Sequence, residues 1–312
     1  MAATLPLPRP SAGAGQDPDP LRPLWLDAAR QRTVPLRLRL PAGDGPAPLL
    51  LFSHGLGGNR EGATVWGEAW AAAGYLVLHL QHPGSDTAAL RDGSLRAAMA
   101  PRQLEHRLRD VAFVLDEVER RQRAGEAPWA RADLSAVGLA GHSFGARVVQ
   151  ALAGERLHPA LPLLAEPRIR AFIALSPSAT GEPGQWRERF AAVRAPMFGI
   201  TGTLDGDVVG TGITAANRLG FIESLPPGRA CGLLLDGADH MSFAGQTGTD
   251  RLMRLLGRPR EAVAEQREPA HHALVSLLST RFWDAMLRQR PDALAALDAP
   301  AEVLAPDRWF RH

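Results

Sequence analysis

Residues 134–154 are the feature that most constrains how this chain of 312 residues folds. An apolar run at 134–140 leads into Gly-His-Ser-Phe-Gly at 141–145, and a helical stretch over 144–154 follows at once. Glycines two residues before and two after a serine let a strand and a helix pass closely at a sharp turn. The segment therefore predicts a strand–turn–helix unit that exposes the hydroxyl of Ser143 as a nucleophile.

Further apolar runs alternate with helical stretches along the rest of the chain. The predicted strands are 33–40, 49–53, 75–80, 169–175, 197–201 and 232–236, and the predicted helices are 61–73, 104–123, 215–224 and 273–287. Short apolar strands separated by helices are typical of βαβ units. We expect an α/β fold with a mostly parallel, doubly wound sheet and helices on both faces. Residues 33–40 alternate between apolar residues and arginine, which favours a half-exposed edge strand.

The sequence predicts one domain between two less regular ends. Residues 1–30 are rich in Pro, Gly and Ala and predict a flexible N-terminal segment. Residues 31–290 contain all the strand and helix patterns, and single α/β domains of about this size are common. Residues 291–312 are expected to form a tail that packs on the domain.

The basic residues exclude several mechanisms. All 35 of them are arginine, because the chain contains no lysine. Schiff-base enzymes, Ser-Lys dyads and phosphate-loop lysines are therefore excluded. The single cysteine, Cys231, precedes an apolar run, so it predicts a core residue and no intramolecular disulfide. No Cys/His cluster has the spacing of zinc ligands, and we expect neither a metal nor a cofactor.

The charge pattern and the apolar runs bear on partners and location. The formal net charge is only +2, and the arginines are scattered among carboxylates, which does not favour nucleic-acid binding. No apolar run reaches the ~18 residues that a membrane helix needs. The first 24 residues lack the apolar core of a signal peptide. As the sequence stands it predicts a cytoplasmic protein, and an exported protein whose signal peptide was removed is the alternative.

A serine hydroxyl needs a base, and the base needs an orienting acid. In strand–turn–helix hydrolases these follow the serine in the order acid, then histidine. His240 lies just past the last predicted strand, at the sheet edge where ligands bind in open α/β folds. Asp205 and Asp207 both follow the strand at 197–201. The spacing favours Asp205 as the acid, whereas Asp207 is expected to cap the next segment and Asp239 to support a turn.

A glycine-rich loop is predicted to supply one half of an oxyanion hole. The strand at 49–53 runs into His-Gly-Leu-Gly-Gly at 54–58. The backbone N–H groups of Leu56 and Phe144 are the predicted donors to a developing oxyanion. The loop lacks the pattern of a nucleotide-binding loop. His54 is expected to bind a neighbouring loop.

Five residues of the loops at this sheet edge are predicted to contact substrate: Gly55, Gly57, His82, Ser176 and Met241. For His82 and Asp86 the alternative is that their side chains tie down their own loop.

Four segments together resemble a known family. They are Ser-His-Gly-Leu-Gly-Gly at 53–58, Gln-His-Pro-Gly-Ser-Asp at 81–86, the 141–145 motif, and Leu-Asp-Gly-Ala-Asp-His at 235–240. In this order they resemble the bacterial predicted dienelactone hydrolase group, which is similar to platelet-activating-factor acetylhydrolases and, more distantly, to cutinase-like polyester hydrolases. The resemblance spans about residues 30–290. Dienelactone hydrolase itself uses a cysteine nucleophile, so its activity is not carried over to this chain.

The resemblance implies the α/β-hydrolase fold, a triad at Ser143, Asp205 and His240, and an oxyanion hole at Leu56 and Phe144. The expected function is hydrolysis of small to medium carboxylic esters through an acyl-enzyme, with a small-molecule ester as the partner. A lipase, polyester hydrolase, thioesterase or acyltransferase with the same triad is the nearest alternative. A non-catalytic binding protein on this fold is an alternative of another class.

Overall fold

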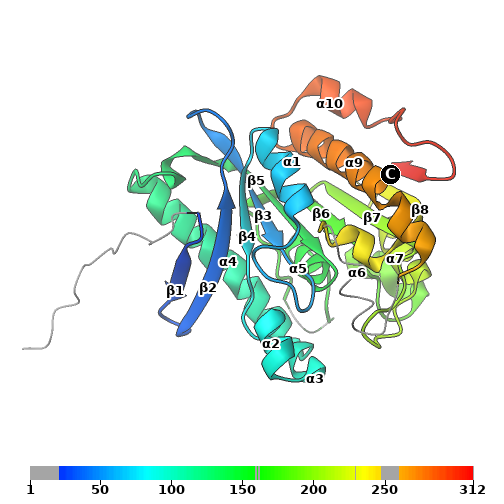
Figure 1. Ribbon diagram of the computed structural model, residues 1–312, viewed down its shortest axis with the longest axis horizontal. Coiled ribbons are helices and arrows are strands. Elements are labelled where there is room, and N and C mark those ends of the chain that lie inside the picture. The colour runs from blue at the N-terminus through cyan, green and yellow to red at the C-terminus, as the bar shows by residue number, and fades with distance from the viewer. Residues whose placement is uncertain (1–20, 159, 161, 229, 247–259, 312) are drawn as a thin grey trace, which may run out of the picture.

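The computed structural model describes residues 21–158, 160, 162–228, 230–246 and 260–311, and every structural statement below concerns these residues. A nine-stranded sheet forms the centre of the molecule (Figure 1), in the order β1-β2-β4-β3-β5-β6-β7-β8-β9. The strands are β1 Leu24–Asp27, β2 Arg32–Arg39, β3 Ala47–Ser53, β4 Leu76–Leu80, β5 Ala132–His142, β6 Ile169–Leu175, β7 Met197–Leu204, β8 Ala230–Asp239 and β9 Arg308–Arg311.

The six central strands, from β4 to β8, run parallel, and the outer strands β1, β2 and β9 pair antiparallel. The helices are α1 Thr64–Ala72, α2 Thr87–Asp92, α3 Leu95–Ala98, α4 Pro101–Arg123, α5 Phe144–Ala153, α6 Trp186–Phe190, α7 Ala215–Glu223, α9 Ala262–Met286 and α10 Pro291–Ala296. This arrangement confirms the predicted α/β class and the mostly parallel sheet.

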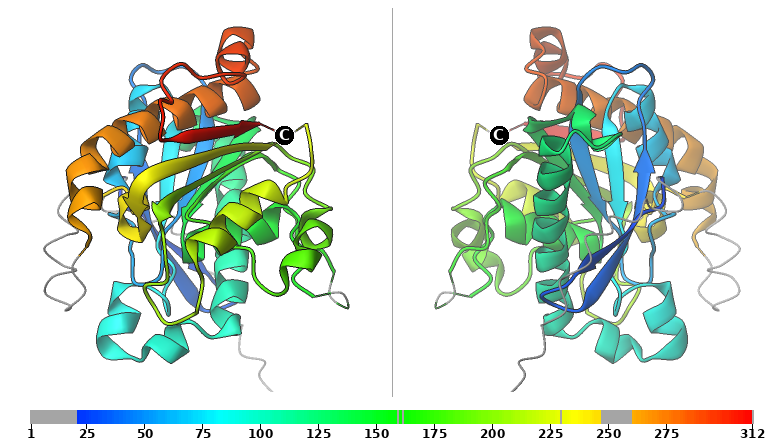
Figure 2. Two further views of the ribbon diagram at one scale, coloured as in Figure 1. Left: turned by 90° about the vertical axis from the view of Figure 1, so that its right-hand side faces the viewer. Right: turned by 90° about the vertical axis from the view of Figure 1, so that its left-hand side faces the viewer.

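Helices cover both faces of the sheet (Figure 2). Side chains of α4, α5 and α7 pack on one face, and side chains of α1 and α9 pack on the other. The central strand β3 is buried along its whole length, as both-face coverage requires. The parallel strands therefore end together at one uncovered edge, where the loops that follow them meet.

The structure corrects two sequence-based expectations about the first strands of the domain. Residues 33–40 do not form an edge strand, because β2 lies between β1 and β4. The edge is β1, which falls inside the predicted N-terminal segment 1–30; residues 1–20 of that segment lie outside the described residues. The predicted tail 291–312 contributes α10 and also β9, which pairs with β8.

The start of α9 is also earlier than predicted. The apolar pattern begins near residue 273, but the helix begins at Ala262. Its first turns pack the buried side chains of Ala264, His271 and His272. Histidine is not counted as apolar, so the apolar pattern alone predicts a helix that is too short.

Trp283 packs α9 against the sheet. It is fully buried, its ring lies 5.9 Å from that of Trp70, and a Cβ atom on Gly138 would come within 2.8 Å of it. We expect Trp283→Ala to lower the free energy of unfolding by about 3–5 kcal/mol, because a large cavity remains. Urea denaturation measures the change. Leu277→Ala, on an exposed position of the same helix, is the control with an expected change under about 0.5 kcal/mol. Equal losses in the two variants would contradict this packing.

Candidate active site

A strained turn between β5 and α5 presents Ser143. Its backbone has φ 56° and ψ −112°, a conformation that non-glycine residues rarely adopt. A Cβ atom on Gly141 would lie 2.5 Å from the carbonyl carbon of Gly145, and one on Gly145 would lie 1.9 Å from the carbonyl oxygen of Ser53. Only glycine fits at either position. The predicted strand–turn–helix unit is confirmed.

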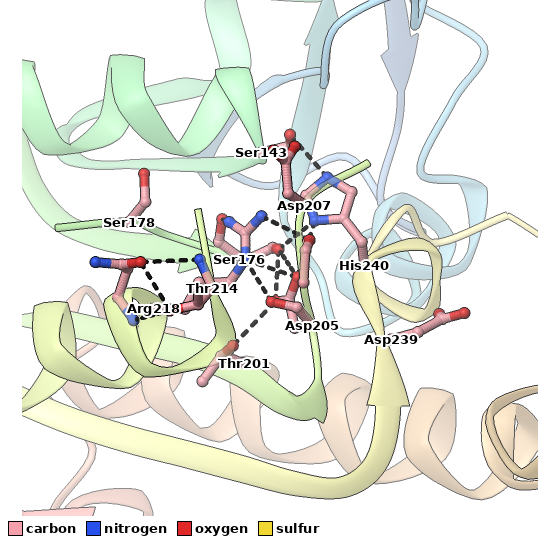
Figure 3. A network of polar contacts seen from close by, with 12 residues as sticks. Ser143, Ser176, Ser178, Thr201, Asp205, Asp207, Thr214, Arg218, Asp239 and His240 are labelled. Atoms are coloured by element: carbon pink, nitrogen blue, oxygen red, sulfur yellow. Dashed lines mark hydrogen bonds and ion pairs between the residues drawn. The ribbon is translucent and has the colours of Figure 1, made fainter. Parts of the chain in front are cut away.

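His240 stands between Ser143 and Asp205 (Figure 3). Its Nε2 lies 2.9 Å from Ser143 Oγ, and its Nδ1 lies 2.9 Å from Asp205 Oδ1. With the imidazole proton on Nδ1, the ring donates to the carboxylate and accepts the serine proton at Nε2. The three residues follow β5, β7 and β8 directly, so parallel strands bring together positions up to 97 residues apart.

The carboxylate of Asp205 is fully buried and has several polar partners. Arg218 Nε lies 2.8 Å from its Oδ1, and the hydroxyls of Ser176 and Thr201 donate to it over 2.6 to 2.9 Å. Burial alone would raise the pKa of Asp205, but the charge of Arg218 and the hydrogen bonds from His240 and Ser176 outweigh burial and lower this pKa. Asp205 is therefore held as an anion beside the imidazole.

Asp207 and Asp239 have the supporting positions expected of them. Asp207 is exposed, and its carboxylate accepts the backbone N–H groups of Val209 and Gly210. Asp239 caps the short helix η3, His240–Phe243, by accepting the N–H of Ser242 over 2.9 Å. The same carboxylate is 2.8 Å from Arg260 Nε, which ties the turn that carries His240 to its surroundings.

Ser176 is one of the predicted substrate-binding residues that the structure places elsewhere. It is 1% exposed, its hydroxyl donates to Asp205, and its Oγ is 2.8 Å from His240 Nδ1. Ser176 directly follows β6 and has a φ of 55°. The expectation of substrate contact is therefore corrected, because the hydroxyl is engaged beneath the site.

His82 is likewise buried instead of lining the surface. Its backbone N–H donates to His54 Nε2 over 3.0 Å, and its ring nitrogens lie 3.0 Å from Ser53 Oγ and 2.9 Å from Asp110 Oδ2. These contacts match the alternative in which the His82 side chain holds its own loop in place. Ser53, His82 and Asp110 make the same contacts as a catalytic triad, with the histidine between the serine and the aspartate. All three side chains are fully buried, however, so no substrate can reach Ser53.

Asp86 also ties its loop, and His54 binds a neighbouring loop as expected. The carboxylate of Asp86 caps α2 by accepting the N–H of Ala89 over 3.0 Å and accepts from Gln81 Nε2 over 2.7 Å.

The glycine-rich loop lies directly against the serine. A Cβ atom on Gly55 would be 3.4 Å from Ser143 Cβ. Gly57 has φ 74° and donates its N–H to the carbonyl of Ser85 over 2.9 Å. Within the described residues, the N–H groups of Leu56 and Phe144 donate to no protein acceptor. Leu56, Phe144 and Met241 are half-buried around Ser143, so the structure leaves these predicted positions open to a ligand.

Arg107, which sequence reasoning missed, fixes this loop from below. It is fully buried on α4 and donates to the carbonyls of His54 and Gly55. Its guanidinium also lies 4.3 Å from the ring centre of Phe144. The Gly55 carbonyl and the Leu56 N–H belong to one planar trans peptide and point in opposite directions. Holding the carbonyl therefore sets the direction of the Leu56 N–H.

Arg218 is a second buried arginine that was missed. From α7 it donates to the backbone carbonyls of Ser176 and Asp205 over 2.8 Å. One signal was available for both arginines. Arg107 lies four residues before the buried Val111, and Arg218 lies three and four residues before the buried Phe221 and Ile222, so each arginine lies on the apolar face of its helix. A charge at such a position needs a buried partner.

No side-chain cluster in the described residues has three His, Cys, Asp or Glu groups placed to hold a metal ion. Among the described helices, none is long and apolar enough to cross a membrane.

Solved structures of other proteins share this fold. A ferulic acid esterase from Streptomyces cinnamoneus superposes with a TM-score of 0.61 at 21% identity, over 91% of this chain and 90% of that one. A 2,6-dihydroxy-pseudo-oxynicotine hydrolase superposes with a TM-score of 0.54 at 13% identity, over 85% of this chain and 67% of that one. The chain has the α/β-hydrolase fold.

The likeness at these identities concerns the α/β-hydrolase fold alone. No family model and no curated protein matches the sequence. The narrower resemblance to the predicted dienelactone hydrolase group therefore stays a prediction.

The buried histidines of the site make stability depend on pH. Burial is the largest cause that lowers the pKa of His82 to about 4 and that of His142 to about 3, from an ordinary value of 6.5. Both bind a proton more weakly when folded, so their contribution is complete above about pH 6.5 and falls as the pH drops toward the folded values.

We therefore expect the free energy of unfolding to fall by about 2 kcal/mol for each of the two histidines between about pH 7 and about pH 5. Urea denaturation at a series of pH values measures this slope. His158→Ala removes an exposed histidine and should leave the slope unchanged. A free energy that stays constant over this interval would contradict the description of neutral, buried rings.

Proposed function

We propose that this protein is a serine carboxylic-ester hydrolase that acts on small to medium acyl esters through an acyl-enzyme. The observation that carries the proposal is the placement of His240, whose two ring nitrogens lie 2.9 Å from Ser143 Oγ and 2.9 Å from Asp205 Oδ1. A half-buried serine with a base and a buried acid in line is the arrangement that nucleophilic acyl transfer needs.

The first half-reaction forms the acyl-enzyme. Ser143 Oγ attacks the ester carbonyl carbon while its proton passes to His240 Nε2. Asp205 stabilises the imidazolium and keeps the ring in its orientation. The N–H groups of Leu56 and Phe144 donate to the oxyanion of the tetrahedral intermediate. When that intermediate collapses, the C–O bond breaks and His240 returns its proton to the departing alcohol.

The second half-reaction releases the acid. Water attacks the acyl carbon of the ester on Ser143, and His240 takes the proton of the water. The same two N–H groups stabilise the second oxyanion. Collapse breaks the bond to Ser143 Oγ, and the proton on His240 returns to that oxygen, which leaves the free enzyme and a carboxylic acid.

The surface around Ser143 supports an acyl group as the ligand. Its half-buried neighbours Leu56, Phe144 and Met241 are apolar, and Gly55 adds no side chain beside the serine. One structural neighbour is named a ferulic acid esterase, so an aromatic acyl ester belongs in any substrate panel beside the straight-chain esters.

Hydrolysis of p-nitrophenyl esters from acetate to palmitate, together with methyl ferulate, tests the proposal. We expect activity on the shorter esters, and Ser143→Ala should lower kcat by about 10⁶-fold because the nucleophile is lost. Asp205→Asn should lower kcat by about 10⁴-fold through the wrong imidazole tautomer.

Ser178→Ala is the matched control, because Ser178 is buried near the site but binds Gln150 through its backbone carbonyl. Ser143→Ala with wild-type activity would refute the mechanism. An optimum at palmitate would replace the small-acyl proposal with a lipase.

Arg107 supplies a second test, since the proposal gives the Leu56 N–H a role that Arg107 orients. Arg107→Gln should lower kcat by about 10²–10³-fold, as the loss of one oxyanion donor does, with little change in KM. Affinity for a boronate transition-state analogue should fall with it. Arg109→Gln, on the same helix but exposed and paired with Glu105, should leave both unchanged. A rise in KM alone would show that Arg107 shapes substrate binding instead.

A further inference from the structure

Unpaired buried nitrogen atoms gather at one place away from Ser143. Arg37 and Arg39 are two residues apart on β2, so their side chains share one face of the sheet, and His79 of β4 pairs directly opposite Arg37. Within the described residues, thirteen buried side-chain nitrogen and oxygen atoms have no hydrogen-bond partner. Five of them belong to these three residues, and all five are nitrogens: Arg37 Nε and Nη1, Arg39 Nη1, and both ring nitrogens of His79.

A cavity of about 410 Å³ opens beside the two arginines. It is lined by Leu21, Arg37, Leu38, Arg39, Leu40, Glu68 and Ala71. It therefore lies between β2 and α1, on the α1 side of the sheet (Figure 1), and shares no lining residue with the surroundings of Ser143. It is wide open to solvent, and its volume exceeds what a single bare ion fills.

The charges around this cavity are only partly balanced. Glu61 is shared by three arginines, with Arg22 at 2.9 Å, Arg60 at 3.7 Å and Arg37 at 3.8 Å. The other carboxylate near Arg39, Glu68, is exposed. Burial first, and then the positive charge of Arg37, lowers the pKa of Arg39. Two neighbouring guanidinium groups with buried N–H groups favour an anion between them.

His79 adds a neutral donor behind the arginines. Burial, and then the charges of Arg39 and Arg37, hold the pKa of His79 well below its usual value, with only the Gly62 carbonyl near enough to oppose them. A neutral imidazole keeps one N–H. Gly67 of α1 leaves room for the ring, since a Cβ atom there would lie 2.4 Å from His79 Nε2 and 3.1 Å from Arg39 Cδ. The ring and the Arg39 side chain therefore meet at the same point.

We propose that this cavity binds a small organic carboxylate, whose oxygens pair with Arg37 and Arg39 and whose short apolar part packs on Leu40 and Ala71. A guanidinium presents parallel N–H groups that match the two oxygens of a carboxylate. The apolar lining and the volume distinguish this ligand from inorganic phosphate. The site does not depend on the proposed function of Ser143.

Titration calorimetry at low ionic strength, with hexanoate as the probe and inorganic phosphate beside it, tests the proposal. We expect hexanoate to bind at one site, and phosphate to bind at least about tenfold more weakly, since it leaves the apolar lining unused. Arg37→Gln/Arg39→Gln should weaken hexanoate by at least about tenfold. Glu68→Gln should tighten it several-fold, because a like charge leaves the cavity.

Two controls keep the result interpretable. Arg170→Gln/Arg194→Gln removes the same charge from exposed positions outside the cavity and should leave binding unchanged. Ser143→Ala should also leave it unchanged, which separates this cavity from the active site. A gain of affinity in Glu68→Gln cannot arise from misfolding. The proposal is overturned if hexanoate does not bind, if it binds equally to Arg37→Gln/Arg39→Gln, or if phosphate binds as tightly.

Discussion

The close approach of Gly145 to the Ser53 carbonyl is the contact on which the rest of the site depends. Gly145 is the second residue of the helix behind Ser143, and Ser53 ends the strand that leads into the glycine-rich loop. The gap admits no side chain, since a Cβ atom would lie 1.9 Å from the oxygen. One backbone contact therefore fixes the distance between the serine and the loop that carries Leu56.

Two buried arginines then fix loop carbonyl groups whose directions this backbone contact does not determine. Arg107 binds the carbonyls of the loop before Leu56, and Arg218 binds the carbonyls beside Ser176 and Asp205. Burying a guanidinium is costly unless its N–H groups are bonded, and here backbone carbonyls and Asp205 bond them. Both arginines act beneath the surface, where they fix the directions of the loop carbonyls and of the Asp205 carboxylate.

Local patterns in the sequence predicted the parts of the molecule that local physics determines. The strand–turn–helix at Ser143 depends on two glycines, and chain order singled out Asp205 and His240, which the structure brings within 2.9 Å of one another. The fold class followed from the alternation of strands and helices. Ser176 was assigned to substrate contact, and for His82 that assignment stood beside the loop-binding alternative, because their partners lie 28 to 64 residues away and nothing near them in sequence marks them as buried. The edge strands β1 and β9 were missed, since four residues carry too short a pattern.

The turns at the carboxyl edge of the sheet are joined to one another by backbone hydrogen bonds. The N–H of Ser143 donates to the carbonyl of Leu175, and the N–H of Ser176, the next residue of that neighbouring strand, donates to the carbonyl of Ile200. Hydrogen bonds between neighbouring strands, from β5 to β6 and from β6 to β7, thus fix the positions of the reacting groups. The surrounding loops do not fix them. Mutations can accordingly change the loops, and with them the ligand that binds, while the distances between the reacting groups stay the same.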